Sequence, residues 1–378
     1  MEQVNWDRLR KVRVERTRKV ITEKGLGAVI LTAFDNVRYL TDVRPLFTPS
    51  VYVDGYAAIL TKDGEVTLVA PFVEEKPLGY AEVMPPIYIP SPIVSDRWIK
   101  IFKDILTNEG ITKGKVGVDY FPLSVYRSAK KELLNVKFVP ILEDLLKVRA
   151  VKHEEEIKLL REAASIVDLG AKVGLGAIKE GRTEYQILAE IIHVMVEAGI
   201  EAIPWYPTFR SGERSLKSIF ASDRKVREGD PVIFDIGCVA RGGYWADLTR
   251  TGFVGEPSED LKETYRALYE VYIETIKSIK PGIMASELDK TCKRKLKEAG
   301  YPVGTAPTGH GLGLGVDLPW IWEDAKEKDM KLEPGMVLSL EPITFKPGLA
   351  AVKLEDMILV TDTGYELLTK AKYEEQYL

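Results

Sequence analysis

Two pairs of acidic residues, each placed symmetrically within an apolar stretch, restrict the fold of this 378-residue chain more than any other feature. In residues 231–254, Asp235 and Asp247 are symmetric about Arg241 in a glycine-containing turn. In residues 335–361, Glu341 and Glu355 are symmetric about Gly348. Both stretches have the β-branched, turn-centred pattern of a hairpin. If each turn lies at its centre, the two carboxylates of each pair face each other across the strands.

Two facing pairs of carboxylates in apolar strands need a compensating charge. Like charges across a ladder destabilise a sheet, and burying them unpaired is costly. Divalent cations supply that charge, and His310, in the glycine-rich stretch 308–313, adds an imidazole that the glycines leave accessible. Taken singly, such residues are usually turn, edge or loop residues, and His153 and His193 are interpreted as structural. Together the five residues favour two divalent ions that clamp a bridging water.

Composition and charge exclude several other classes. The formal net charge is −4, with no basic surplus that would neutralise a nucleic-acid backbone. No apolar run approaches the ~20 residues that span a bilayer, and no apolar stretch follows the charged N-terminus. We therefore expect a cytoplasmic protein with no membrane or nucleic-acid partner, in which Cys238 and Cys292 are free thiols. Few Asn and Gln beside abundant Lys, Arg and Glu indicate a thermophilic source.

The hydrophobic pattern predicts two domains, 1–150 and 151–378, joined near residues 147–153. The first domain is expected to be α/β, because predicted strands and helices alternate. The expected strands cover 27–33, 56–60, 66–70, 115–118 and 136–141, and the expected helices 5–24, 96–108 and 123–134. In the second domain we expect a long helix from about 152, a helix capped by Thr183, a helix over 259–279 capped by Ser258, and a helix over 286–299 that stops at Gly300.

The same residues carry a family resemblance. The segments that carry it are IFDIGCVARGGYWADLTRTGFVGEPS, TGHGLGLGVDLP, LEPGMVLSLEPI and VKLEDMILVTDTGYELLT, preceded by VKHEEEIKLLREAASI. They resemble the prolidase, aminopeptidase P, creatinase and methionine aminopeptidase superfamily, strongly over about 152–372 and more weakly before that. The resemblance implies an α/β (α+β) protein with a creatinase-type N-terminal domain and a C-terminal pita-bread domain. Because of the long N-terminal domain, the chain resembles the prolidase branch more than methionine aminopeptidase.

The resemblance also implies a role for each of the five site residues. Asp235 would bind one metal ion, and Asp247 and Glu355 would bridge the two ions. His310 and Glu341 would complete the shell of the second ion, and Glu341 would be the catalytic residue that shuttles the proton. Thr249 would help to orient the ligands. The ligand set suits Mn, Co, Fe or Zn alike, so the identity of the metal stays open.

Three positions depart from the family pattern. Asp317 stands where prolidase-like enzymes usually carry a histidine seven residues after the metal histidine. Ile219 replaces an upstream family histidine, and Lys353 replaces an arginine two residues before the last glutamate. The metal residues are thus retained while the substrate-binding residues are changed. We therefore expect cleavage of ordinary Xaa-Pro dipeptides to be slow or absent, with a different physiological substrate that fits Trp320, Lys353 and the arginines.

Aromatic and basic residues near the motifs are further candidates for substrate binding. Trp205, Trp245, Trp320 and Trp322 could form aromatic walls, and Arg210, Arg214 and Arg241 could bind a carboxylate. Alternatively, the tryptophans belong to the core or to a dimer interface. Our candidate substrate-binding residues are Asp317, Ile219, Lys353, Trp320 and Arg214.

The resulting prediction is a dinuclear metallohydrolase that acts on a short peptide or related amide, with Xaa-Pro dipeptidase or aminopeptidase activity as the family default. A homodimer is implied by the resemblance. Three alternatives stay open: a non-peptidase enzyme on the same metal core, such as a small-molecule C–N hydrolase or a lyase; a catalytically inactive binding module; and a metal-free creatinase-like enzyme. The last two are disfavoured because all five ligands are present.

Overall fold

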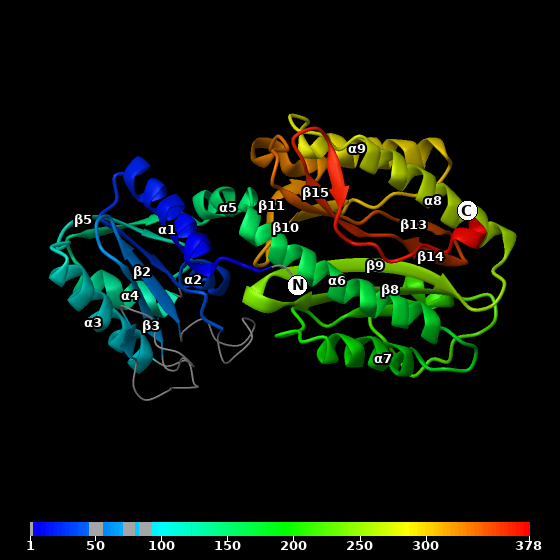
Figure 1. The fold of residues 1–378 in the computed structure, drawn as a ribbon, viewed down its shortest axis with the longest axis horizontal. Coiled ribbons are helices and arrows are strands. Elements are labelled where there is room, and N and C mark those ends of the chain that lie inside the picture. The colour runs from blue at the N-terminus through cyan, green and yellow to red at the C-terminus, as the bar shows by residue number, and fades with distance from the viewer. Residues whose placement is uncertain (1–2, 45–55, 71–79, 83–91, 122) are drawn as a thin grey trace. The chain divides into compact units, whose positions relative to one another are not determined.

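The structure is a computed structural model that describes residues 3–44, 56–70, 80–82, 92–121 and 123–378. The chain divides into two compact units (Figure 1). One unit is Asn5–Arg149, and the other is Ala150–Leu378 together with the described residues before Asn5. Among the described residues, no helix combines the length and the apolar composition that crossing a membrane requires.

The N-terminal unit is a mixed sheet with helices. Its sheet has the strand order β4-β3-β2-β1-β5-β6, in which β1, β2 and β3 are antiparallel neighbours and β5 and β6 run parallel to β1. The predicted hairpin is present, because Ala57 pairs with Val69. The strands are β1 (Ala28–Leu31), β2 (Ala57–Thr61), β3 (Val66–Ala70), β4 (Tyr80–Glu82), β5 (Gly114–Val118) and β6 (Val136–Pro140). The helices are α1 (Trp6–Glu23), α2 (Phe34–Thr41), α3 (Pro92–Asn108), α4 (Leu123–Glu132) and α5 (Leu142–Ala150).

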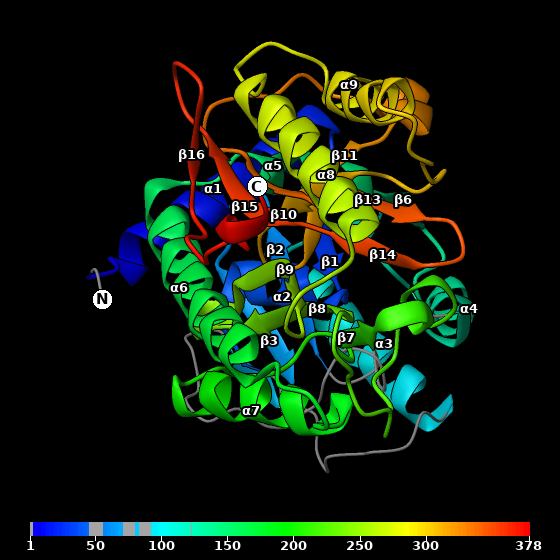
Figure 2. The same cartoon turned by 90° about the vertical axis from the view of Figure 1, so that its right-hand side faces the viewer.

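The C-terminal unit places strands between two pairs of helices. Helices α6 and α7 lie on the outer side of β8 and β9, and helices α8 and α9 lie on the opposite side of the unit, which Figure 2 shows from its end. The helices are α6 (Glu154–Ala177), α7 (Glu184–Glu197), α8 (Glu259–Lys277) and α9 (Ala285–Glu298), with short 3₁₀ turns at Gly212–Leu216, Arg241–Gly243, Glu323–Lys328 and Glu375–Tyr377.

Three sheets make up the strand layers of this unit. Their strand orders are β7-β8-β9, β11-β10-β12-β15-β16 and β13-β14. The strands are β7 (Thr208–Ser211), β8 (Pro231–Val239), β9 (Trp245–Phe253), β10 (Gly309–Leu312), β11 (Val316–Ile321), β12 (Val337–Leu340), β13 (Ile343–Lys346), β14 (Ala350–Lys353), β15 (Asp356–Val360) and β16 (Tyr365–Leu367).

Side-chain caps form at the starts of α1, α6 and α7, whereas α2, α8 and α9 begin without one. Thr183 forms the predicted cap of α7, and its side chain accepts a hydrogen bond from the backbone N–H of Gln186. His153 caps α6 in the same reciprocal way. Ser258 occupies the predicted N-cap position of α8, but within the described part of the chain its hydroxyl makes no capping hydrogen bond. Two acidic residues in the first turn of α8 instead favour the positive end of the helix dipole.

The first carboxylate hairpin forms with a different register from the predicted one. Asp247 pairs with Gly237, and Asp235 pairs with Thr249, so the two aspartates are diagonal neighbours rather than directly opposite. The turn centres on Gly242 instead of Arg241, because Gly242 and Gly243 both adopt positive φ. A displacement of two residues keeps both aspartates on the same face of the sheet.

The second hairpin has the predicted register and changes sheets halfway. Leu340 pairs with Asp356 and Ile343 with Lys353, so both ladders are symmetric about Gly348. Glu341 lies between β12 and β13, and Glu355 lies between β14 and β15, at the point where the chain leaves one sheet for the other. At this junction the backbone N–H of Glu341 donates to the carbonyl oxygen of Thr308, and that of Glu355 donates to the carbonyl oxygen of Thr249, so each glutamate is held by a segment outside its own hairpin.

Candidate metal centre

The structure brings all five predicted site residues together. One ligand atom each from Asp247, His310 and Glu355 lie within 4.8 Å of one another. The same holds for Asp235, Glu341 and Glu355, so Glu355 belongs to both groups. The residues come from β8, β9, β10 and the two junctions of the second hairpin. Coordination by two ions that share a carboxylate requires this kind of convergence.

Burial and mutual repulsion act on the carboxylates of this cluster. Burial, reinforced by the charges of Glu355, Asp235 and Glu341, raises the pKa of Asp247 well above its ordinary value. Burial is also the main cause that raises the pKa of Glu355 to about 8. Within the described chain, Oδ1 of Asp247 is buried and has no hydrogen-bond partner. A buried acceptor of this kind fits a metal ion.

The ring of His310 is oriented as a metal ligand would be. Its Nδ1 lies 3.0 Å from the carbonyl oxygen of Gly311, a contact in which the ring N–H donates. That tautomer leaves the lone pair of Nε2 free for a metal. Nε2 lies 3.7 Å from Asp247 Oδ2 and 3.6 Å from Glu341 Oε1. The donor set and its geometry therefore fit divalent cations.

Two hydroxyl groups fix the carboxylate of Glu355. Thr249 Oγ1 donates to Oε2 at 2.6 Å, and Ser339 Oγ donates to Oε1 at 2.5 Å. The contact of Thr249 is the orienting one that the family resemblance implies. Our sequence analysis missed Ser339, although it is the single polar residue in the buried strand β12, which was the available signal.

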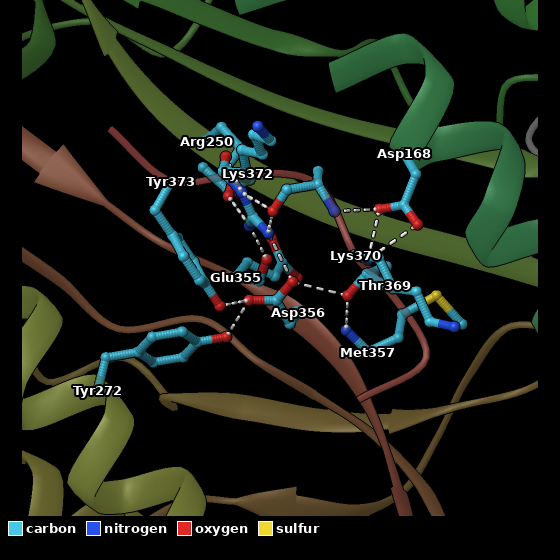
Figure 3. A network of polar contacts seen from close by, with 12 residues as sticks. Asp168, Arg250, Tyr272, Glu355, Asp356, Met357, Thr369, Lys370, Lys372 and Tyr373 are labelled. Atoms are coloured by element: carbon cyan, nitrogen blue, oxygen red, sulfur yellow. Dashed lines mark hydrogen bonds and ion pairs between the residues drawn. The ribbon is translucent and has the colours of Figure 1, made fainter. Parts of the chain in front are cut away.

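A buried polar network fixes the backbone of Glu355 (Figure 3). Arg250 Nη1 donates to the carbonyl oxygen of Glu355 at 2.6 Å, and its Nη2 donates to Asp356 at 2.7 Å. The hydroxyls of Tyr272 and Tyr373 both donate to the other oxygen of Asp356 at 2.7 Å. This network connects α8, β9 and the C-terminal segment to Glu355 and to the start of β15.

The amino group of Lys353 lies within the carboxylate cluster. Its Nζ is 2.6 Å from Asp235 Oδ2, 2.7 Å from Glu341 Oε2 and 3.5 Å from Glu355 Oε2. Burial lowers the pKa of this lysine, but the three carboxylates outweigh burial and raise it well above its ordinary value. Lys353 was predicted as a substrate-binding residue, and in this structure it is a counter-ion of three of the site carboxylates.

The other predicted substrate-binding residues are more scattered. Asp317 is buried, and its Oδ2 lies 3.2 Å from the equally buried Nζ of Lys152. Ile219 is 46% exposed, so its side chain does not fill the space of a buried imidazole. The guanidinium of Arg214 donates to the carbonyl oxygen of Phe220 at 2.9 Å. These positions therefore do not rebuild the two missing histidines.

Aromatic residues lie beside the cluster. Trp320 pairs with His310 across β10 and β11, and the two ring centroids are 6.1 Å apart. The same tryptophan lines a pocket of about 620 Å³ together with Pro307 and Trp322. Trp245 lies on β9 two residues before Asp247, and its ring centroid is 5.7 Å from that of Trp205. Apolar surface is thus available next to the site.

Fold and site together define a class of protein. A pita-bread unit that gathers four carboxylates and one imidazole, and that follows an α/β unit along the chain, is the framework of a metal-dependent hydrolase. Residues 158–362 match metallopeptidase family M24, and residues 13–151 match the creatinase/prolidase N-terminal domain. The chain belongs to metallopeptidase family M24.

Individual relatives extend over nearly the whole chain. It is 30% identical over 368 residues to an Xaa-Pro dipeptidase of Pyrococcus furiosus, a match that covers 96% of this chain and 99% of that protein. An uncharacterized peptidase of Bacillus subtilis is also 30% identical and covers 96% of this chain and 99% of its own length. The solved structure of an Xaa-Pro dipeptidase from Bacillus anthracis is similar with a TM-score of 0.82 at 29% identity, covering 97% of this chain and 99% of that one.

Proposed function

We propose that this protein is a dipeptidase of the Xaa-Pro type that works with two divalent metal ions. The convergence of Asp235, Asp247, His310, Glu341 and Glu355 carries the proposal. Relatives of nearly equal length are Xaa-Pro dipeptidases, which supports the reaction class. When bound, the ions would supply an activated water and a Lewis acid for the scissile carbonyl.

Residues of this chain would orient the metal ligands and transfer the proton of the attacking water. The side chain of Glu341 is 24% exposed, more than those of Asp247 and Glu355, so it is open to a substrate. A carboxylate in that place can take a proton from the attacking water and pass it to the leaving nitrogen. Thr249 and Ser339 keep Glu355 from rotating, which preserves the geometry that both metal sites share.

The residues expected to bind substrate favour the prediction that ordinary dipeptides are hydrolysed slowly. The carboxylate of Asp317 is paired with Lys152, and Ile219 carries no donor, so neither replaces a family histidine. Losing one well-placed donor costs about 2.7–4 kcal/mol, or ~10²–10³ in rate. The same observation favours a second candidate function, the hydrolysis of a C–N bond in a small molecule other than a peptide.

The decisive experiment is a substrate panel with each metal. The protein is stripped with a chelator, reloaded with Mn, Co, Fe or Zn, and assayed on Xaa-Pro dipeptides, with Xaa-Ala dipeptides as the control. We expect slow, metal-dependent cleavage that prefers proline and is lost in Asp247→Asn. Metal binding without any peptide cleavage would favour the non-peptidase function, and a failure to bind metal would contradict both.

The same assay tests the predictions that Asp317 and Trp320 bind the substrate. Asp317→His is expected to raise dipeptidase activity. Trp320→Ala is expected to raise KM for substrates with a large apolar first residue, because its ring lines the neighbouring pocket. A loss of activity in Asp317→His would mean that other residues supply the missing donor.

Three finer predictions concern the whole protein. We propose a homodimer, a cytoplasmic location and a thermophilic source. Light scattering of the purified protein checks the first, fractionation of the source cells checks the second, and a melting temperature above about 80 °C would support the third because mesophile domains melt at about 45–65 °C.

A further inference from the structure

Arg210 lies on the face of the three-stranded sheet that carries the site aspartates. On β7, Arg210 pairs with Ile233 and Thr208 pairs with Asp235, so the Arg210 and Asp235 side chains point to the same side. The opposite face carries Phe209 and Phe234, whose rings stack, and Phe234 packs against Gly174 of α6. The face with Arg210 is therefore the one turned away from the helices.

The guanidinium of Arg210 is buried, and the described residues give it no hydrogen-bond or ion-pair partner, although the charge of Asp235 acts on it from beyond ion-pair distance. The residue is 7% exposed, and its Nε is fully buried without a hydrogen bond. Among the described residues, no carboxylate lies within 4 Å of its nitrogens and no hydrogen bond from them is formed. A buried charge without a partner is costly, so its presence here indicates that an anion binds to it.

Other arginines near the site are already engaged. Arg241 Nη2 contacts Glu162 at 2.6 Å, and Arg224 Nη2 donates to Asp230 at 3.1 Å. Arg214 donates to a backbone carbonyl oxygen. Of the three arginines that the sequence offered as carboxylate receptors, only Arg210 retains an available guanidinium.

The position of Arg210 on β7 determines the distance between an anion bound to its guanidinium and the candidate metal ligands. Its partner on β8, Ile233, is two residues from Asp235, which is a spacing of roughly 7 Å along an antiparallel strand. The terminal carboxylate of a dipeptide is within about one residue length, ~3.5 Å, of the scissile carbonyl carbon. The side chain of Arg210 is long enough to span the remaining distance between its own backbone and that carboxylate. A longer peptide would place its carboxylate beyond this reach.

We propose that Arg210 binds the free carboxylate of a short substrate and thereby selects dipeptides over longer or amidated peptides. The proposal rests on the proposed function, because it assigns the carboxylate end of that substrate. The planar guanidinium suits a carboxylate by two parallel hydrogen bonds. Trp205 and Trp245, at the opposite end of the β8–β9 ladder, remain for the apolar part of the substrate.

A simpler role for Arg210 would be that of a counter-ion for Asp235. The structure already gives Asp235 a counter-ion, because Lys353 Nζ contacts it at 2.6 Å while Arg210 does not lie within ion-pair distance. The two roles predict different stabilities for Arg210→Met. Removing a counter-ion lowers the melting temperature, whereas removing an unpaired buried charge leaves it unchanged or raises it.

The test compares a carboxylate with its amide on the metal-loaded protein. Calorimetry gives the Kd of proline and of prolinamide, and kinetics give kcat/KM for Ala-Pro and Ala-Pro amide. We expect the native protein to favour the carboxylate form, and Arg210→Met to reduce that preference about tenfold to hundredfold. Arg210→Lys should retain part of it, and Arg227→Met, which removes an exposed positive charge from the same unit, should retain all of it.

The outcomes separate this inference from the proposed function. If Ala-Pro is not hydrolysed but proline binding still depends on Arg210, the inference stands and the proposed function fails. If Ala-Pro is hydrolysed and the preference is the same in Arg210→Met, the inference is overturned and the function stands. A native protein without preference for the carboxylate, or an equal loss in Arg227→Met, also overturns the inference.

Discussion

At the scale of single residues, charge compensation decides how four carboxylates coexist in a small buried volume. Lys353 is the chain's own cation in this cluster and contacts Asp235 and Glu341 directly. A divalent ion at the same carboxylates has to displace that ammonium group or share them with it. Lys353 is therefore expected to stabilise the metal-free protein while competing with metal.

Lys353→Met tests this competition. In the metal-free protein we expect the free energy of unfolding to fall by about 3 kcal/mol, because the variant removes the ammonium counter-ion that Asp235, Glu341 and Glu355 share. The affinity for Mn²⁺ should rise at least about tenfold, since no ammonium group has to leave. Denaturant unfolding and calorimetric titration measure the two effects.

The matched control is Lys346→Met in the same hairpin. Lys346 forms an exposed pair with Asp260, which is worth at most about 1 kcal/mol, and it lies outside the cluster. If Lys353→Met binds Mn²⁺ more weakly than the native protein, the ammonium group assists metal binding and the competition does not exist.

At the scale of elements, the site depends on segments that hold one strand junction in place. Arg250 on β9 donates to the carbonyl oxygen of Glu355 and to Asp356, and the tyrosines of α8 and of the C-terminal segment complete the network. Helix α6 supports β8 from the other side through closely approaching glycines. Both supports can be changed without touching a site residue.

Asp356→Asn is expected to destabilise the protein by about 3–5 kcal/mol, because it leaves the buried Arg250 without its charged partner. Metal affinity should fall as well, since Arg250 also fixes the backbone of Glu355. Asp168→Asn, which weakens hydrogen bonds to the backbone of Lys370 and Ala371 and leaves the contact between Arg250 and Asp356 in place, is the control and should cost about 1 kcal/mol. Equal losses in urea unfolding would show that Asp356 has no special role.

Two glycines of α6 are expected to respond oppositely to alanine. A Cβ at Gly174 would lie 2.8 Å from the Cδ1 of Ile191 and 3.1 Å from the ring of Phe234, so Gly174→Ala should destabilise by about 1–3 kcal/mol. At Gly176 a Cβ meets no described atom within 4 Å, so Gly176→Ala should stabilise by about 0.4–1 kcal/mol. Melting curves of the two variants measure the difference, and shifts in the same direction would contradict the packing of α6.

At the scale of the whole molecule, we expect metal binding, protonation and folding to be coupled. The pKa of Glu355 is about 8 in the folded metal-free protein, against 4.5 for an ordinary glutamate. The folded state therefore holds a proton that the unfolded state releases between these values. Stability from this group is complete below about pH 4.5 and is lost as the pH rises toward 8.

We expect the metal-free protein to become less stable between about pH 5 and pH 8, and the metal-loaded protein to lose this dependence because the ions replace the proton. Thermal unfolding in a chelator and in Mn²⁺, across that range, gives the comparison. Glu355→Gln should flatten the profile of the metal-free protein. A metal-free profile that rises toward pH 8 would contradict the raised pKa.

The sequence by itself determined several local elements and selected the candidate residues of the site. The period of apolar residues and the turn residues predicted the hairpin of the first unit, the cap at Thr183 and the symmetry of the second hairpin about Gly348. It also pointed to the five site residues that the structure brings together. These features depend on neighbours in the chain or on residue chemistry, which the sequence displays directly.

Only the tertiary structure decided which side chains meet. Asp317 and Lys152 are 165 positions apart in the chain, and no local pattern predicts that they form a buried pair. The register of the first hairpin was set by two adjacent glycines with positive φ, which shifted the turn by one residue from the predicted centre. Whether an arginine is engaged or available, as for Arg210, depends on which distant groups pack around it, because electrostatic and hydrogen-bond partners are chosen by distance in space rather than by separation along the chain.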